Sequence, residues 1–317
     1  MSGAAGGRVA LRALRDGDEV KIGALDAHIT GARELAVEAV RVYDGVERLA
    51  ASSGGTTLGL ATVKADNEAY AANFAAIRAR LGQTGNAAFR LKSGVEVRAP
   101  GDLALAADWN LAPLRAGGAA GELTLRAGGD LDLAAHLSDG FNVATPLSGS
   151  LPATLLADDS WGYRLIGGAD LAAADPLSTR AGAGDVTLAA GKQVRTGSGD
   201  IRIAAGGDIH LLSAQSVIYT AGKLAAPLDG YTPPAANARA QFSTGGGDLS
   251  LSARGSLLGA PSTQFFNDWL FRQGGVADSG DYWRLQGSPY TVHYHKDNEE
   301  GHQPVYMIGW GRQRKEG

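Results

Sequence analysis

The sequence predicts an all-β fold: a right-handed parallel β-helix (β-solenoid) with one inserted amphipathic helix and an aromatic-rich irregular tail. Three observations predict it: a short Gly-Asp phrase that recurs along the chain, 46 glycines in 317 residues, and a hydrophobic content of 44%. Glycine is costly inside helices and useful at corners, and here it reaches about twice the usual ~7%. The hydrophobic residues supply enough apolar surface for a folded core, which disfavours disorder.

Composition and charge exclude several classes of protein. The absence of cysteine removes disulfide frameworks and cysteine-ligated zinc or iron–sulfur sites. The formal charge is −4, spread along the chain, so no basic patch indicates nucleic acid or acidic lipid as a partner. No long apolar run predicts a membrane-spanning segment, and the start of the chain lacks the apolar core of a signal peptide. We therefore expect either a cytoplasmic protein or an internal piece of a longer exported one.

The repeated phrase is Gly-Asp (once Gly-Glu) followed by three residues whose first and third are Leu, Ile or Val. Its seven copies lie at 101–105, 121–125, 129–133, 184–188, 199–203, 207–211 and 247–251. Such recurrence is typical of repeat architectures.

Each copy is interpreted as a turn followed by a short strand. Leu131 and Leu133 project to one side and Asp132 to the other, so one face is expected to be buried and one solvated. Closely spaced copies, such as those that begin at 121 and 129, are interpreted as successive sides of one coil. The wider spacings, from 101 to 121 and from 207 to 247, are interpreted as one and two turns of a solenoid. A single coil cannot enclose its own apolar residues, so we expect neighbouring coils to stack.

The glycines and aspartates of these phrases are predicted to be structural. The pairs Gly128–Gly129 and Gly206–Gly207 and the run Gly245–Gly247 are expected at corners with left-handed backbone, and the following aspartate can accept a hydrogen bond from a turn N–H. A calcium-binding nonapeptide repeat is excluded because it places a residue between its last glycine and its aspartate, whereas Gly199 and Asp200 are adjacent.

Residues 1–50 show weaker alternation and are predicted to form degenerate β-helix coils. A helical insertion is expected at 51–84. Within it, an alanine-rich segment from Thr62 to Leu81 carries apolar residues at helical spacing, and Gly82 follows as a stop. Its polar face has mixed charge, which favours packing onto the protein over membrane binding.

The main β-helix is expected at 85–261, with proline-containing loops at 141–180 and 219–241. Aromatic residues crowd into the stretch from Phe265 to Trp310, so 262–317 is predicted to be an aromatic-rich tail or cap that continues into something missing.

The run GAGDVTLAAGKQVRTGSGDIRIAAGGDIHL (182–211), with RAGGDLDLAA (126–135), resembles the filamentous haemagglutinin family, and FFNDWLFRQGG (265–275) is similar to aromatic phrases late in these proteins. The resemblance covers about half of the chain. It implies a segment of a large exoprotein, secreted to or displayed on the surface of a Gram-negative bacterium by two-partner secretion. An outer-membrane partner transporter would export the full-length parent, and host-cell or bacterial surface receptors or glycans would be bound. The signal peptide and secretion domain of such a parent are not present in this chain.

Three groups of residues are candidates for chemistry. His293 and His295 share a face if 291–295 is a strand, and a carboxylate could join them on a zinc ion; the spacing is too loose to be specific, and a solvated strand and turn is expected. The nearby acidic and histidine residues are Asp297, Glu299, Glu300 and His302.

The second group is Asp158–Asp159 beside Trp161 and Tyr163, where an aromatic ring next to acids could stack on a sugar; a plain acidic loop is favoured. The third is the set of outward positions in the repeats, which forms no carboxylate pair suited to general acid and base work. These positions are Thr124, Asp132, Thr187, Arg202, His210 and Ser250.

We therefore predict no catalytic, cofactor-binding or metal-binding residue, and a stiff adhesive stalk rather than an enzyme. Two alternatives remain open: a β-helix polysaccharide lyase or hydrolase, and the stalk of a contact-dependent growth inhibition toxin.

Overall fold

The computed structural model describes residues 6–25, 29, 31–115, 119–141, 155–223 and 245–261, and the course of the backbone at 142, 154, 224, 243–244, 291–295 and 305–309. The chain divides into two compact units. The first comprises Met1–Leu147, Leu155–Lys223 and Gly245–Pro261; the second comprises Ser148–Thr154, Leu224–Thr244 and Ser262–Gly317.

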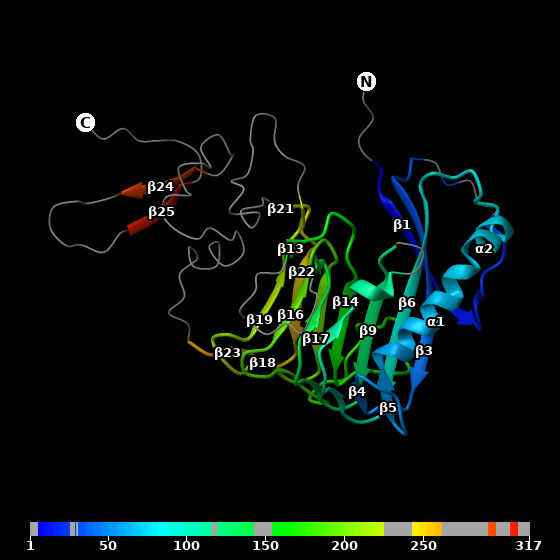
Figure 1. Ribbon diagram of the computed structural model, residues 1–317. Coiled ribbons are helices and arrows are strands. Elements are labelled where there is room, and N and C mark those ends of the chain that lie inside the picture. Colours follow the sequence, from blue (N-terminus) through cyan, green and yellow to red (C-terminus); the bar gives the residue numbers. More distant parts are fainter. Residues whose placement is uncertain are drawn as a thin grey trace. The chain divides into compact units, whose positions relative to one another are not determined.

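The first unit contains three large sheets whose strands stand side by side (Figure 1). The first sheet has the order β2 (Glu19–Val20), β1 (Arg8–Asp16), β3 (Glu34–Asp44), β6 (Phe89–Ala99), β9 (Glu122–Ala127), β14 (Gly162–Gly167), β17 (Ile201–Ala205), β22 (Leu249–Ala253). The second has the order β23 (Leu257–Gly259), β18 (Ile209–Leu211), β15 (Val186–Leu188), β10 (Leu131–Leu133), β7 (Leu103–Leu105), β4 (Arg48–Ala50), β5 (Thr57–Gly59). The third has the order β19 (Val217–Thr220), β16 (Gln193–Thr196), β11 (Leu137–Ser138), β8 (Trp109–Asn110).

Almost every pairing within these sheets is parallel. Among the described pairings of the three sheets, only β1 with β2 is antiparallel. The prediction of an all-β chain built from parallel strands with few helices is confirmed at this level.

The chain visits the sheets in a fixed order. From β6 to β19 each strand of the first sheet is followed by one in the second and one in the third before the chain returns to the first; we call this passage a circuit. The described chain completes four: β6–β7–β8, β9–β10–β11, β14–β15–β16 and β17–β18–β19. The seven Gly-Asp phrases all follow β6, three leading into the first sheet and four into the second.

The close spacing of copies is correctly interpreted, because 121–125 and 129–133 lead into β9 and β10, successive sides of one circuit. The interpretation of the two wider spacings as whole turns is wrong. The copy at 101–105 lies in the second sheet and that at 121–125 in the first; the copies at 207–211 and 247–251 differ likewise.

Circuit length varies along the chain. Leu103 pairs with Leu131, and Leu131 in turn pairs with Val186. The stretch of sequence between Leu131 and Val186 is much longer than that between Leu103 and Leu131. Insertions at the corners change the length of a circuit without changing the register of its strands.

The core is a set of residue columns that run across circuits. On the second sheet Leu103, Leu131, Val186 and Ile209 are successive register partners, and all are at most 2% exposed. On the third sheet Trp109 continues into Leu137 and Val194. These columns meet in one cluster that also includes the inward residues of β6, β9, β14 and β17. The predicted alternation is confirmed, because Leu131 and Leu133 are buried while Asp132 is exposed.

Two helices replace the single predicted one: α1 (Leu60–Ala72) and α2 (Phe74–Arg80) meet at Asn73. Asparagine competes with the helix for its own backbone groups, and its backbone here leaves the helical region. Tyr70, Ile77 and Leu81 nevertheless pack as predicted, in a second cluster with the first halves of β3 and β6. Neither helix has the length and apolar character required to cross a membrane.

Two intervals differ from their predicted roles. The expected loop at 141–180 contains β14, a strand in the middle of the first sheet, and the expected loop at 219–241 begins inside β19. Proline content misled the interpretation, because the prolines flank β14 rather than occupy it. Within residues 1–50, β1 and β3 extend the first sheet with parallel pairing.

The remaining described elements are short. A 3-10 helix spans Ala112–Leu114, and two-stranded sheets pair β12 (Phe141–Asn142) with β13 (Thr154–Leu155), β20 (Lys223–Leu224) with β21 (Ser243–Thr244), and β24 (Thr291–His295) with β25 (Val305–Gly309). The strand expected at 291–295 is confirmed. The aromatic phrase at 265–275 lies outside the described residues.

Candidate functional site at the corner between the first and second sheets

At the corner that leads into the second sheet, successive circuits each place an aspartate, and these aspartates form a hydrogen-bonded ladder. Each carboxylate accepts a hydrogen bond from the backbone N–H at the same corner of the next circuit. The N–H of Asp130 donates to Asp102 Oδ1 at 2.8 Å, that of Asp185 to Asp130 Oδ1 at 2.9 Å, and that of Asp208 to Asp185 Oδ1 at 2.7 Å. Ser256 N–H donates to Asp208 Oδ1 at 2.6 Å and ends the ladder. The predicted structural role of these aspartates is confirmed.

Two of the glycines before these aspartates, Gly129 and Gly207, are required for a different reason from the one predicted. Gly128, Gly129, Gly206 and Gly207 do not have positive φ; of the predicted corners, only Gly245 does, at 64°. A Cβ on Gly129 would lie 2.1 Å from the Oδ1 of Asp102, and one on Gly207 2.1 Å from that of Asp185. At these two positions the aspartate of the previous circuit occupies the space that a side chain would fill. At Gly184 the backbone oxygen of Gly129 occupies it, 2.2 Å from the Cβ position, and at Gly101 the space is open.

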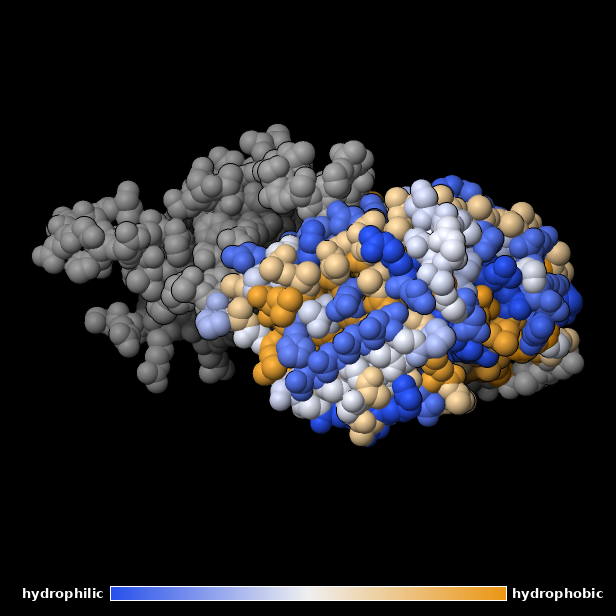
Figure 2. Space-filling model, turned by 90° about the horizontal axis from the view of Figure 1, so that it is seen from below, coloured by the Kyte–Doolittle hydropathy of each residue, from blue (hydrophilic) through white to orange (hydrophobic). Residues whose placement is uncertain are grey.

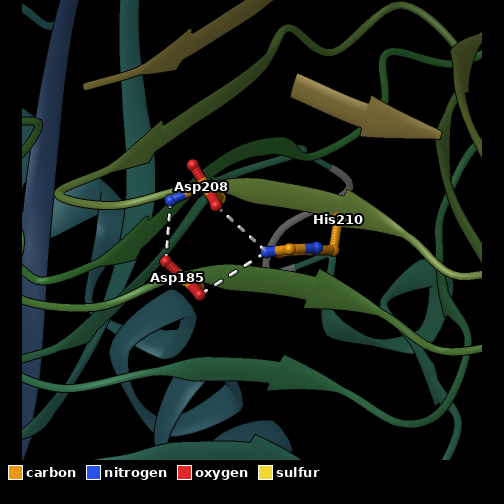
Figure 3. Close-up of side chains that lie close together, drawn as sticks. All are labelled: Asp185, Asp208 and His210. Carbon is orange, nitrogen blue, oxygen red and sulfur yellow. Dashed lines mark hydrogen bonds and ion pairs between the residues drawn. The ribbon is translucent and has the colours of Figure 1, made fainter. Parts of the chain in front are cut away.

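One part of this ladder also carries a histidine. His210 Nε2 lies 3.5 Å from Asp185 Oδ2 and 3.7 Å from Asp208 Oδ2, and the three side chains point toward one another across successive strands (Figure 3). All three are partly exposed, with side-chain values of 27%, 40% and 35% for His210, Asp185 and Asp208. The cluster offers two carboxylate oxygens and one imidazole nitrogen that lie within 4.8 Å of one another. Such a donor set can take up a cation.

The outward side of the first sheet carries a second ionic cluster, and it is buried. Glu96 on β6 accepts from Arg12, from Arg98 at 2.6 Å and from Arg126 at 3.1 Å, and it is 0% exposed. Because its partners come from β1, β6 and β9, the cluster ties three strands together across the sheet.

Glu38 on β3 extends this cluster. Its carboxylate accepts hydrogen bonds from both Nη atoms of Arg164 at 3.0 Å and from Nε of Arg12 at 3.2 Å. Gly94 makes room for it, since a Cβ there would lie 3.1 Å from Glu38 Oε1. The prediction of a solvated outer face is therefore wrong for this part of the first sheet: Thr124, predicted outward, is 0% exposed.

Burial and pairing act in opposite directions on the carboxylates here. Burial raises the pKa of Glu96, but hydrogen bonds from Arg12, Arg98 and Arg126 outweigh it and hold that pKa below its ordinary value. Burial raises the pKa of Glu122, and Arg164, 3.6 Å away, only partly opposes it. The charges are arranged to hold strands together and leave no open acid–base pair in this part of the described sheet.

Asp158 and Asp159 lie in an exposed loop, as the favoured interpretation predicted, and the alternative of sugar stacking is wrong. Trp161 and Tyr163 are 0% exposed and belong to the core, so neither ring can stack on a sugar. Asp159 is exposed and pairs with Lys223 at 2.5 Å. The alternation of Trp161 and Tyr163 is typical of a strand with one buried face and could have indicated their burial. The prolines on either side of the strand favoured a loop instead.

The structure does not test the other sequence candidate, because the side chains of His293 and His295 and all of Asp297, Glu299, Glu300 and His302 lie outside the described residues. The cluster at His210 was missed. Asp208 and His210 are two apart and share a face, which the sequence shows, but Asp185 joins them only through the register of a neighbouring circuit.

The face of the described unit seen in Figure 2 shows no single chemical character. On the face seen in Figure 2, hydrophilic, intermediate and hydrophobic residues are interspersed. The large hydrophobic residues exposed among the described ones include Leu249, Leu257 and Leu258, on the last described strands of the first two sheets. No protein-family model, curated protein or solved structure matches the chain.

Proposed function

We propose that the three sheets are the sides of a right-handed parallel β-helix, and that the chain is a segment of a large secreted, surface-associated exoprotein resembling filamentous haemagglutinin. Its role is that of a stiff adhesive stalk in contact with host cells, bacteria or biofilm.

The observation that carries the proposal is the parallel register, kept from circuit to circuit on all three sheets. Leu103 and Leu131, Trp109 and Leu137, and the strands β9 and β14 are partners despite circuits of different length. In such a stack the backbone hydrogen bonds run along the axis, about 4.8 Å per layer, and every layer covers the apolar residues of the next. This favours a rigid element that displays its corners at regular intervals.

Binding by such a stalk would come from many weak contacts on repeated faces, with avidity exceeding each contact. The mixed surface and the buried charges of the first sheet support this reading over catalysis. The burial of Trp161 and Tyr163 removes the one aromatic–acid group that favoured a polysaccharide enzyme.

Export is tested in the bacterium that produces the protein, with an antibody against this chain applied to intact cells. We expect surface staining that disappears when the outer-membrane partner transporter is deleted and returns when it is restored. Staining that requires permeabilised cells in every strain would overturn the assignment to an exported protein.

Adhesion is tested with beads coated with the purified full chain and applied to epithelial and bacterial cells. We expect binding above that of albumin-coated beads and competition by excess soluble chain. Equal binding by both beads would contradict the adhesive role, and turnover of acidic polysaccharides that Asp159→Asn abolishes would favour the enzyme instead.

A further inference from the structure

We propose that Asp185, Asp208 and His210 form a binding site for a divalent transition-metal cation, with Zn²⁺ as the ion that fits best. The site lies at the corner between the first and second sheets and goes beyond the proposed stalk function.

The two separations between His210 and the carboxylates are close to those between ligands of one ion, and the three donor atoms lie within 4.8 Å of one another. Bonds of ~2.0–2.1 Å in a tetrahedral site place two ligand atoms about 3.3 Å apart. His210 Nε2 lies 3.5 Å from Asp185 Oδ2 and 3.7 Å from Asp208 Oδ2. Small side-chain rotations therefore bring all three atoms onto one ion, and the partial exposure of the cluster leaves a position for water.

The carboxylates are held in place by groups that are not ligands. Asp185 Oδ1 accepts the N–H of Asp208 and Asp208 Oδ1 accepts that of Ser256, which leaves each Oδ2 free to face His210 (Figure 3). Hydrogen bonds of this kind orient metal ligands and raise affinity. Among the described residues, His210 is the one basic side chain within ion-pair distance of either carboxylate.

The preceding circuit provides an internal comparison. Asp130 and Asp185 form the same ladder bond, but Thr187 occupies the register position of His210. The imidazole, a preferred ligand of Zn²⁺, is what distinguishes the site from the rest of the ladder.

The test is calorimetric titration of the full chain with ZnCl₂. His293, His295 and His302 are replaced by alanine in every sample, since these histidines could bind zinc themselves. We expect the Kd for zinc to rise at least about tenfold in each of three variants: His210→Thr, Asp185→Asn and Asp208→Asn. Asn keeps the Oδ1 acceptor, so the ladder persists. Asp130→Asn is the matched control and should bind zinc unchanged.

A second readout is the melting temperature, which zinc should raise in the reference chain and in Asp130→Asn but not in His210→Thr. Circular dichroism of each variant establishes that it is folded. Equal zinc affinity with and without His210, loss in His210→Thr alone while both asparagine variants bind normally, or an equal loss in Asp130→Asn would each overturn the site.

Discussion

The Gly-Asp pair is the smallest unit of this architecture, and its two residues belong to different contacts. The aspartate reaches forward to the N–H of the next circuit, and at Gly129 and Gly207 the glycine leaves space for the aspartate of the previous circuit. At these two corners the contacts explain why glycine and aspartate are adjacent, with no residue between them.

Gly207→Ala tests this explanation. The new Cβ would lie 2.1 Å from Asp185 Oδ1, so we expect the free energy of unfolding in urea to fall by about 1–3 kcal/mol. Gly101→Ala is the matched control from the same phrase, because nothing lies within 4 Å of a Cβ there. Equal destabilisation by the two substitutions would refute the close-approach role.

Two glutamates of the first sheet should respond oppositely to loss of charge. Glu96→Gln leaves the buried guanidinium of Arg126 without its carboxylate, so we expect a loss of about 3–5 kcal/mol at neutral pH. The lowered pKa of Glu96 means that its ionised form stabilises the fold above its ordinary pKa, and that this contribution disappears as pH falls through the folded value. The difference between wild type and Glu96→Gln should therefore shrink in acid.

Glu122 has a raised pKa, so its ionised form opposes folding at neutral pH. Glu122→Gln should be neutral or stabilising at neutral pH, and its advantage should vanish as pH falls below the ordinary glutamate pKa. Thermal unfolding of both variants from acid to neutral pH measures this. A large loss of stability in Glu122→Gln at neutral pH would contradict the assignment.

At the scale of the strand, alternation determines what each position tolerates. Leu133→Ala opens a cavity in a column that Leu105 and Leu188 line, and should cost about 2–5 kcal/mol in urea unfolding. Asp132→Ala, on the exposed side of the same strand, should stay within about 0.5 kcal/mol. Comparable losses at both positions would mean that β10 does not present alternate faces.

The sequence predicted these strands well wherever Gly-Asp marked their start, because the phrase contains both the corner and the alternation. The prediction failed at β14, because no Gly-Asp phrase precedes this strand. The strand is nevertheless tightly packed: a Cβ on Gly121 would lie 2.7 Å from the ring of Trp161. The helix was located correctly from the spacing of Tyr70, Phe74, Ile77 and Leu81, and its break at Asn73 was missed because spacing alone does not report a change of axis.

At the scale of the whole unit, the stacking of short strands in successive layers was predictable, but the sheet to which each wider-spaced copy belongs and the register of the strands were not. Asp185 lies beside Asp208 and Asp130, and Glu96 forms an ion pair with Arg126, although the circuits that bring them together differ in length. The lengths of the insertions do not indicate which residues will become neighbours. The clusters at His210 and Glu96 could therefore be found only after the circuits were aligned.

The central claim is that successive circuits stack as parallel, in-register neighbours, and engineered disulfides test it most directly because the chain has no cysteine of its own. Asp132 and Thr187 are register partners on neighbouring strands, about 4.8 Å apart, whereas Asp132 and His210 are separated by an intervening strand. We expect the chain with Asp132→Cys and Thr187→Cys to form an intramolecular disulfide under mild oxidation, and the chain with Asp132→Cys and His210→Cys to remain reduced, since its Cα atoms exceed the ~7 Å limit for a bridge. Ready closure of the second pair, or failure of the first in a folded chain, would contradict the stacked arrangement.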